Sequence, residues 1–452
     1  MTLKHSNHQN RDLGLCSAAG IVVCGMIGAG IFTTTGLHAA ELGSSWAIML
    51  VWILGGLLAL CGTLTYIELA TLWPEAGGSY VFVRNIYGPA TGFVVGLSVA
   101  IISCMGSLAI VGMAFGAYFQ KLETGIPPET AANTAVMIAT LIHCLGVREG
   151  NAVNQIGAIF KIALLSGLVV WGFSVEATAD TLPPNTKEDA IVFSPSTFGS
   201  AMAAVAFAYL GWDNPTYIAG EIRDSRRSLK WGMSLGMIAV TILYLLVNSI
   251  FLRAAAPHEM IQSDGSPVVD IGQFSALRLF GETAGSTFNV LIGIVLFSTL
   301  CLNAMIGARV FYSMGRKREL PRDLSILNSR GSPYIALGVQ CIGAMLLIQF
   351  TVLKDLLESV GVILTVISSV TVFGVILLRI RQPDLKRPYR VPFYPLPPLI
   401  YLMLTFWMAW SVFRSNPISI ILILGTIGIA LAIWLGYTSV RSQPPSKGNT
   451  SI

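Results

Sequence analysis

The amino-acid sequence predicts an all-α integral membrane protein with twelve transmembrane helices. Only 11% of its 452 residues are charged, whereas soluble domains carry about 25%. The depletion is patterned, because uncharged segments of roughly 20 residues recur along the chain, the length that a helix needs to cross the ~30 Å hydrocarbon layer. Ten such segments are present: 13–40, 42–67, 85–120, 130–147, 231–252, 283–308, 331–353, 359–378, 391–413 and 415–440.

Two further spans each carry one charge. Segment 150–175 contains Lys161, and segment 190–220 contains Asp213. Together with the ten uncharged segments they complete the twelve. A soluble protein would have to bury ten helices of membrane length in one core, so we reject that interpretation.

The distribution of positive charge predicts the topology. If the N-terminus is cytoplasmic, the twelve spans place 20 of the 28 Lys and Arg residues in cytoplasmic segments and six in external loops. This positive-inside bias predicts a multi-pass protein of a cell membrane (plasma or bacterial inner) with both termini in the cytoplasm. The net charge of +5 is therefore a topology signal, and no nucleic-acid partner is expected.

Neither a metal nor a cofactor is predicted. The seven cysteines fall in or beside the apolar segments without paired spacing, and the five histidines are scattered, so they form no disulfide or metal framework. No P-loop, H-E-x-x-H or dinucleotide fingerprint occurs. A G-x-S-x-G match at 232–236 lies inside an apolar span, without the strand–turn–helix context of a nucleophile. We therefore do not expect an enzyme.

Spans 1 and 6 contain residues that interrupt a helix. Span 1 has glycines at 25, 28 and 30, and each costs about 1 kcal/mol relative to alanine in a helix interior. Span 6 combines Gly211, Asp213 and Pro215, and proline removes a backbone hydrogen bond. Interrupted spans at corresponding positions of two halves indicate a transporter site between inverted repeats. We expect one transport domain, with a tail at 1–12, repeats at 13–175 and 190–380, two extra helices at 391–440 and a tail at 441–452.

The two breaks predict a site for an amino acid. Backbone N–H groups freed at residues 28–30, at the positive end of the following half-helix, suit a carboxylate. Carbonyl groups freed after Phe207 suit an ammonium group. The alternative is that the glycines only permit close helix packing.

Lys161 lies at the centre of an otherwise apolar span, where a charge is costly and marks a functional candidate. Its ammonium can replace a bound cation, contacting carbonyl groups near Cys24 and Ile27 and hydroxyl groups at Ser298 or Thr299. The alternative is a lysine that extends to the membrane surface.

Four more positions carry paired hypotheses. Asp213 either couples transport to protons or orders the break by accepting backbone hydrogen bonds. Glu68, near the cytoplasmic end of span 2, has a structural role or a coupling role. Asn303 lines the cavity or bonds between helices, and Phe207 gates the substrate or packs in the core.

These motifs resemble those of the amino acid–polyamine–organocation superfamily. Residues 25–32 (GMIGAGIF) are similar to its span 1 signature, G-x-x-I-G-[SA]-G-I-F, and residues 207–212 (FAYLGW) resemble its span 6 pattern. Further matches are YIEL at 66–69 with Pro74 and GGSY at 77–80, Glu221, Asn303, Gly307, Arg309, LP at 320–321 and RPYRVP at 387–392. Within the superfamily, the chain looks most like L-type amino-acid transporters and their bacterial relatives.

The resemblance implies a LeuT-type fold of five-plus-five inverted repeats with discontinuous helices 1 and 6, working by alternating access. It implies that the substrate contacts two short stretches and two polar side chains: Ile27, Gly28, Ala29, Gly30 and Ile31; Phe207, Ala208, Tyr209 and Leu210; Asp213 and Asn303. Lys161 aligns with a lysine that stands in for sodium, in a surrogate site with Cys24, Ser298 and Thr299. That implies sodium-independent exchange or proton coupling, with Asp213 and Glu68 as the coupling candidates.

The same resemblance bears on partners and substrates. The loop at 119–130 lacks the cysteine with which light subunits of heteromeric transporters bond a glycoprotein, so no disulfide-linked heavy subunit is expected. Asp213 departs from the L-type pattern, where Asn is usual, and is similar to cationic amino-acid permeases. Two alternatives stay open: a permease for polyamines or other amines, and an amino-acid sensor that has lost flux.

Overall fold

The computed structural model describes residues 13–120, 122, 125–176, 194–351, 353–415, 425, 428 and 430–435. Within these ranges the regular structure is helical, apart from the isolated bridges Leu13–Ile222 and Ile261–Pro267. The two predicted tails, most of the loop at 176–195 and most of the twelfth predicted span lie outside the described residues.

Seven helices of the described chain are long and apolar enough to cross a membrane: Leu15–Leu42, Ser45–Leu72, Pro89–Gln120, Val147–Ser174, Ser225–Ala254, Glu282–Arg316 and Ile363–Arg381. Three shorter apolar helices accompany them, at Thr197–Ala208, Tyr334–Phe350 and Leu396–Ser411. The chain is thus an all-helical, multi-pass membrane protein, which confirms the coarse prediction.

The helices of the first half are α1 (Leu15–Met26), α2 (Ala29–Leu42), α3 (Ser45–Leu72), α4 (Ser79–Tyr87), α5 (Pro89–Ser98), η1 (Val99–Met105), α6 (Gly106–Gln120), α7 (Pro128–Leu145) and α8 (Val147–Ser174). The predicted span 1 is therefore two helices, and α5, η1 and α6 form one span through a π-helical segment that the sequence did not predict. Proline begins α5 and α7, where its missing N–H has no intrahelical partner in any case.

The second half contains α9 (Pro195–Ala208), α10 (Asn214–Tyr217), η3 (Ala219–Glu221), α11 (Ser225–Ala254), η4 (Pro257–Met260), α12 (Ile271–Phe280), α13 (Glu282–Arg316), η5 (Arg322–Ser325), α14 (Tyr334–Phe350), α15 (Leu353–Arg381) and α16 (Leu396–Ser415). The predicted span 6 is again divided, into α9 and α10. Both interruptions predicted from glycine and proline are therefore present.

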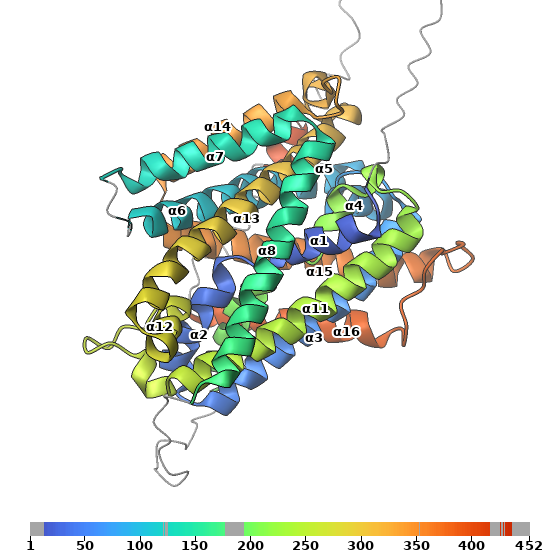
Figure 1. Ribbon diagram of the computed structural model, residues 1–452. Helices are drawn as coiled ribbons and strands as arrows, with labels where there is room; N and C mark the ends of the chain where they lie inside the picture. The colour runs from blue at the N-terminus through green and yellow to red at the C-terminus, as the bar shows by residue number, and fades with distance from the viewer. Residues whose placement is uncertain are drawn as a thin grey trace, which may run out of the picture.

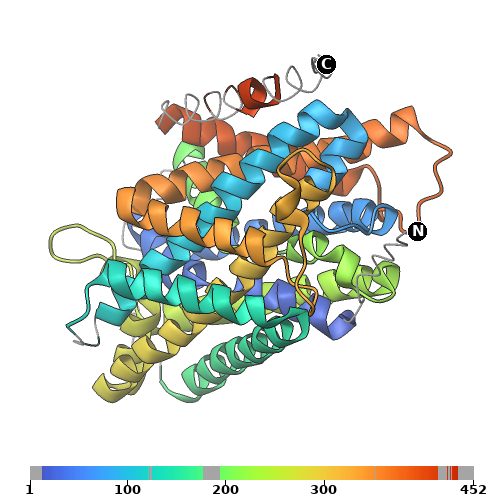
Figure 2. The same cartoon turned by 90° about the horizontal axis from the view of Figure 1, so that it is seen from above.

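The two divided spans lie inside the bundle. α1 packs against α11, α8 and α13, while α2 packs against α9 and α12 (Figure 1). α8 runs along the outside of the bundle in Figures 1 and 2. One of its faces is apolar and exposed, with Ile156 at 68% and Val170 at 72%, yet Lys161 on the opposite face is fully buried. Lipid covers such an apolar face without cost, so α8 can direct Lys161 inward.

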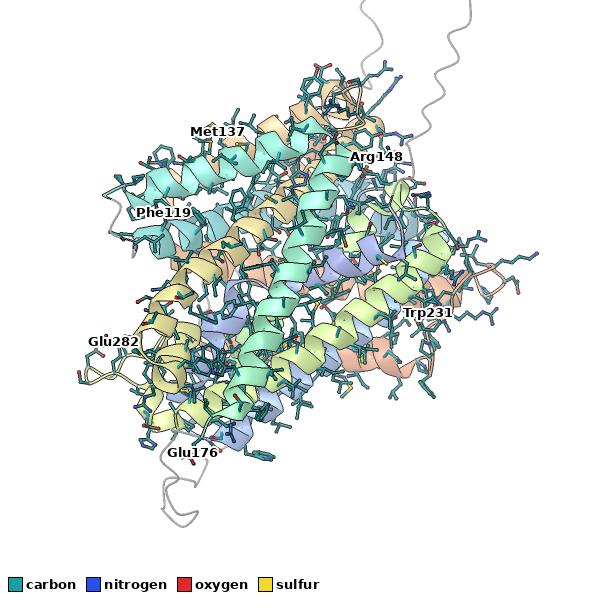
Figure 3. All side chains as sticks on the ribbon, in the orientation of Figure 1. Phe119, Met137, Arg148, Glu176, Trp231 and Glu282 are labelled. Atoms are coloured by element: carbon teal, nitrogen blue, oxygen red, sulfur yellow. The ribbon has the colours of Figure 1, made fainter. Side chains whose placement is uncertain are left out.

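The helix ends separate into two sides of the molecule. Figure 3 shows Phe119, Glu176 and Glu282 toward one side and Arg148 and Trp231 toward the other. The first three residues stand at the end of α6, just after α8 and at the start of α13, and the other two near the starts of α8 and α11. The helices therefore run between two opposite surfaces, as spans of a bilayer must.

Candidate functional site

The break in span 1 is confined to two residues. α1 ends at Met26, Ile27 is extended (φ −76°, ψ 95°), and Gly28 precedes the first residue of α2. Ala29, Gly30 and Ile31 are thus already helical, so the unwound stretch is shorter than the predicted 28–30. A short break leaves fewer backbone groups without partners, which matters where no water is available to bond them.

The break in span 6 is longer and depends on a glycine. α9 ends at Ala208, and residues 209–213 form turns before α10. Gly211 has a φ of +110°, which side-chain-bearing residues rarely adopt. Pro215 lies in the first turn of α10, where its missing N–H removes no helix bond.

The two breaks lie directly against each other. A Cβ atom placed on Gly30 would stand 2.7 Å from Cα of Ala208, and one on Gly211 would stand 2.6 Å from the carbonyl carbon of Gly25. These glycines therefore allow backbone-to-backbone contact between the spans, as the packing alternative proposed. Gly28 differs, since its nearest neighbour would be Thr299 at 3.8 Å. Of the three span 1 glycines, Gly28 alone would admit a Cβ atom at ordinary van der Waals distance from its neighbours.

Side chains from other helices bind the carbonyl end of α1. The last carbonyl groups of a helix have no intrahelical partner. Lys161 Nζ donates to Cys24 O at 2.7 Å, and the hydroxyl of Tyr244 donates to Met26 O at 2.5 Å. The amide of Ile27 donates to Val23 O at 3.0 Å. A cation at the negative end of a helix is electrostatically favourable, so Lys161 stabilises α1 where it stops.

Lys161 joins three helices. Besides Cys24 on α1, its Nζ donates to the hydroxyl of Thr299 on α13 at 2.8 Å. Ser298 contacts the sulfur of Cys24 instead, at 3.2 Å. Gly157, one turn before Lys161 on α8, would collide with the Ser298 hydroxyl if it carried a side chain. This glycine lets α8 approach α13 closely enough for the lysine to reach Thr299.

The opposite end of the break presents N–H groups. In the first turn of α2, the amides of residues 28–31 have no carbonyl four residues earlier in the same helix. They lie at the positive end of the α2 dipole. The site therefore combines a bound negative helix end at α1 with a positive helix end at α2 whose first N–H groups have no intrahelical acceptor, an arrangement suited to a small anionic group.

Comparison with known proteins identifies the family. A family model described as "Amino acid permease" matches residues 13–432. The chain belongs to the amino acid permease family. Membership confirms the predicted resemblance.

The permease is 28% identical over 440 residues to the large neutral amino acids transporter small subunit 2 of Homo sapiens, covering 94% of this chain and 78% of that protein. It is 28% identical over 429 residues to the serine/threonine exchanger SteT of Bacillus subtilis, covering 91% of this chain and 93% of that protein. It is 29% identical over 451 residues to the Asc-type amino acid transporter 1 of Mus musculus, covering 96% of this chain and 82% of that protein. These relatives are transporters and exchangers, in agreement with a transport protein rather than an enzyme.

The span 6 residues of the permease face different ways. Phe207 is half-buried, and its carbonyl accepts the amide of Leu210 at 3.0 Å, so this carbonyl is less free than predicted. The side chain of Tyr209 turns toward α3, where its hydroxyl donates to Trp52 O at 3.1 Å. The carbonyl of Ala208 lies 3.2 Å from the Tyr244 hydroxyl. Tyr244 thus touches the ends of both α1 and α9.

Asp213 and Asn303 lie apart from Lys161. Asp213 is half-buried at the start of α10 and has no ion pair within the described residues. Its carbonyl oxygen accepts the amide and the hydroxyl of Thr216, at 2.9 and 2.7 Å. The amide of Asn303 donates to Ser107 O on α6 at 3.5 Å, a contact between helices rather than with either break.

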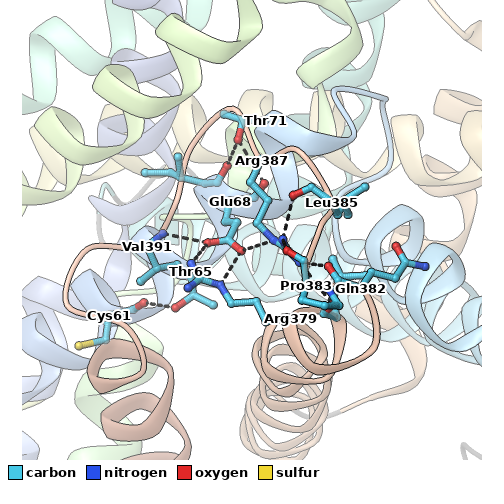
Figure 4. A network of polar contacts seen from close by, with 12 residues as sticks. Cys61, Thr65, Glu68, Thr71, Arg379, Gln382, Pro383, Leu385, Arg387 and Val391 are labelled. Atoms are coloured by element: carbon cyan, nitrogen blue, oxygen red, sulfur yellow. Dashed lines mark hydrogen bonds and ion pairs between the residues drawn. The ribbon is translucent and has the colours of Figure 1, made fainter.

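Glu68 lies in an ion-pair cluster at the end of α3 (Figure 4). Its buried carboxylate accepts two hydrogen bonds from Arg379, at 3.0 and 2.5 Å, and one from the amide of Val391 at 2.8 Å. Arg387 Nε stands 3.2 Å from the same carboxylate. A carboxylate with so many donors joins α3 to α15 and to the segment before α16, which favours the structural alternative for Glu68.

Two features of the permease site were missed at the sequence level. Tyr244 is one, and the pairing of Glu221 with Arg309 is the other, although both of these residues match motifs of the family. Arg309 on α13 is 1% exposed and donates to Glu221 at 3.0 and 3.3 Å. The sequence signal that could have indicated these contacts is a polar side chain inside an apolar span, since such groups are buried and paired in membrane proteins.

Proposed function

We propose that the permease is a sodium-independent secondary amino-acid transporter that works by alternating access. In this proposal the substrate carboxylate binds the N–H groups at the start of α2, beside Gly28. The substrate amine binds carbonyl groups of Ile27 and of the turn after α9. The observation that carries the proposal is the contact between two interrupted helices, with the positive end of α2 beginning beside Gly28 at that contact.

Lys161 supports the absence of a sodium requirement. Its ammonium occupies a position between a helix-terminal carbonyl and a hydroxyl, Cys24 O and Thr299 Oγ1. Oxygen ligands of these types also bind cations such as sodium, and a resident ammonium contributes the same charge permanently. The carrier then needs no sodium ion to assemble the break.

The architecture proposed with this function is a LeuT-type arrangement of twelve spans, with repeats at 13–175 and 190–380 and both termini cytoplasmic. The paired breaks in α1–α2 and α9–α10 support it, because inverted repeats place such breaks opposite each other. We propose a cell membrane as the location and no disulfide-linked subunit, since the loop at 119–130 has no cysteine.

Exchange is the preferred mode of transport. One relative is named as a serine/threonine exchanger and another as a transporter of large neutral amino acids. We propose neutral amino acids as the substrates on this basis. Asp213 favours one alternative, a cationic amino acid or amine, because its carboxylate has no ion pair in the described part of the chain.

The test is counterflow in proteoliposomes. Vesicles containing the purified protein are loaded with serine, leucine or buffer, and uptake of labelled serine, leucine, lysine and putrescine is measured in sodium and in choline. We expect uptake of serine or leucine that requires internal amino acid and is equal in the two salts. Stimulation by sodium would contradict the role of Lys161, and binding without counterflow would indicate a sensor.

A pair of glycine variants tests the carboxylate site. A Cβ atom on Gly28 would meet only Thr299, at 3.8 Å, so Gly28→Leu places a bulky side chain beside the N–H groups. A Cβ atom on Gly167 of α8 would meet no neighbour within 4 Å, which makes Gly167→Leu the matched control. We expect Gly28→Leu to abolish amino-acid uptake and Gly167→Leu to leave it unchanged. If Gly28→Leu spared uptake of putrescine, the amine permease would replace the present proposal.

A further inference from the structure

A groove lies between α6 and α13, away from the proposed substrate site. Its volume is about 280 Å³, and its apolar walls include Phe115 and Phe119 from α6 and Phe297 from α13. Asn289, which also lines it, precedes Thr299 by ten residues, or about 15 Å along a helix. α6 and α13 are neighbours in Figure 1, and Figure 3 shows Phe119 and Glu282 toward the same side of the molecule.

The groove opens toward lipid. Val290 and Ile294, which belong to its lining, are 46% and 47% exposed on a membrane-spanning helix. Tyr118, which also lines the groove, donates a hydrogen bond of 2.5 Å to Asp270 in the segment before α12. Exposed apolar side chains on a spanning helix contact acyl chains, so the molecules that reach this groove come from the bilayer.

A glycine and two aromatic contacts give the groove its shape. Gly293 has nothing within 4 Å of the place where a side chain would stand. Among the other lining residues, the rings of Phe115 and Phe119 stack at 5.9 Å, and the ring of Phe297 lies 6.3 Å from Phe115. The volume is close to the lower end of ordinary ligand pockets, about 300 Å³. It therefore suits one hydrocarbon chain.

Asn289 supplies a polar group at one end of the groove. Its residue is 9% exposed, and its Oδ1 atom has no hydrogen-bond partner. A buried polar atom without a partner is costly, and more so beside hydrocarbon. Asn289 follows the start of α13 by seven residues, about 10 Å, a depth near the boundary between head groups and acyl chains. The oxygen is buried as the side chain stands, but Asn289 lines the groove, so a half-turn of its amide group brings the oxygen to a lipid head group with a donor.

We propose that the groove binds one bilayer phospholipid whose head group donates a hydrogen bond to Asn289 and whose acyl chain lies over Gly293. The head group must carry N–H or O–H donors, as phosphatidylethanolamine does. Phosphatidylcholine has the same net charge but only methylated nitrogen, so it lacks the donor. The site is independent of the transport proposal, because neither the breaks nor Lys161 contribute to it.

The experiment compares these two lipids on the purified full-length protein. Delipidated protein in detergent is mixed with equal amounts of phosphatidylethanolamine and phosphatidylcholine with identical acyl chains, and bound lipid is measured by native mass spectrometry. One net hydrogen bond predicts a preference of about fivefold for phosphatidylethanolamine. The wild-type protein should retain one such molecule after the others are removed by activation.

Three variants separate the parts of the site. Gly293→Leu should lose the retained lipid, while Gly338→Leu on α14, a glycine that also meets nothing within 4 Å, should keep it. Asn289→Leu should bind both lipids equally. Equal retention of the two lipids by the wild-type protein, or an undiminished preference in Gly293→Leu, would overturn the proposal.

Discussion

Replacing Lys161 with methionine removes a charge from the contact of α1, α8 and α13 while it keeps a long unbranched side chain. The variant loses the bonds to Cys24 O and Thr299 Oγ1, of 2.7 and 2.8 Å. Hydrogen bonds to a charged group contribute about 1.5–3 kcal/mol each. Burying an ammonium costs several kcal/mol, so the two effects largely offset each other in the free energy of unfolding.

The bond by which Lys161 on α8 holds the end of α1 is not offset in this way. Without the lysine, Cys24 O at the end of α1 has lost a bond of about 1.5–3 kcal/mol. If one conformation in the transport cycle needs this bond, its population falls by about 10- to 150-fold, because 1.4 kcal/mol corresponds to a factor of ten. We therefore expect Lys161→Met to transport at less than a tenth of the wild-type rate, with a thermal midpoint near that of the wild type.

Counterflow in proteoliposomes and thermal unfolding in detergent measure the two quantities separately. Ser298→Ala serves as the matched control, since Ser298 contacts the sulfur of Cys24 and not Lys161 Nζ. Gly157→Ala should displace α8 and reduce transport, and the double variant Gly157→Ala with Ser298→Gly should restore it, because the collision is removed. Wild-type flux in Lys161→Met would refute the proposed role of the lysine.

Three further predictions concern the other polar contacts. Tyr244→Phe leaves Met26 O without its donor, so we expect a loss of about 1–3 kcal/mol in stability, measured by thermal unfolding; an unchanged midpoint would contradict it. Glu68→Gln weakens the contacts with Arg379, so we expect about 3 kcal/mol of destabilisation in the same assay. Counterflow per folded molecule should stay normal; if the folded variant lost counterflow, Glu68 would have a role in coupling instead. Asp213→Asn should abolish uptake driven by an imposed pH gradient if Asp213 carries the proton, and equal uptake in both proteins would exclude it.

The places where helices stop were predictable from the sequence. Glycine and proline act on their own backbone, so the breaks near Gly28 and Gly211 follow from local chemistry. The membrane class follows from segment length and charge depletion, which need no knowledge of neighbours. Lys161 stood out for the same reason, as a charge in an apolar segment.

Partners were decided only by the tertiary structure. Gly30 lies against the backbone of Ala208, whereas Gly28 has only Thr299 near it, and this difference depends on which side of the broken span meets α9. The same holds for Lys161, which bonds Thr299 and not Ser298. Adjacent residues on a helix point about 100° apart, so the rotation of α13 chooses between them, and packing against several helices sets that rotation.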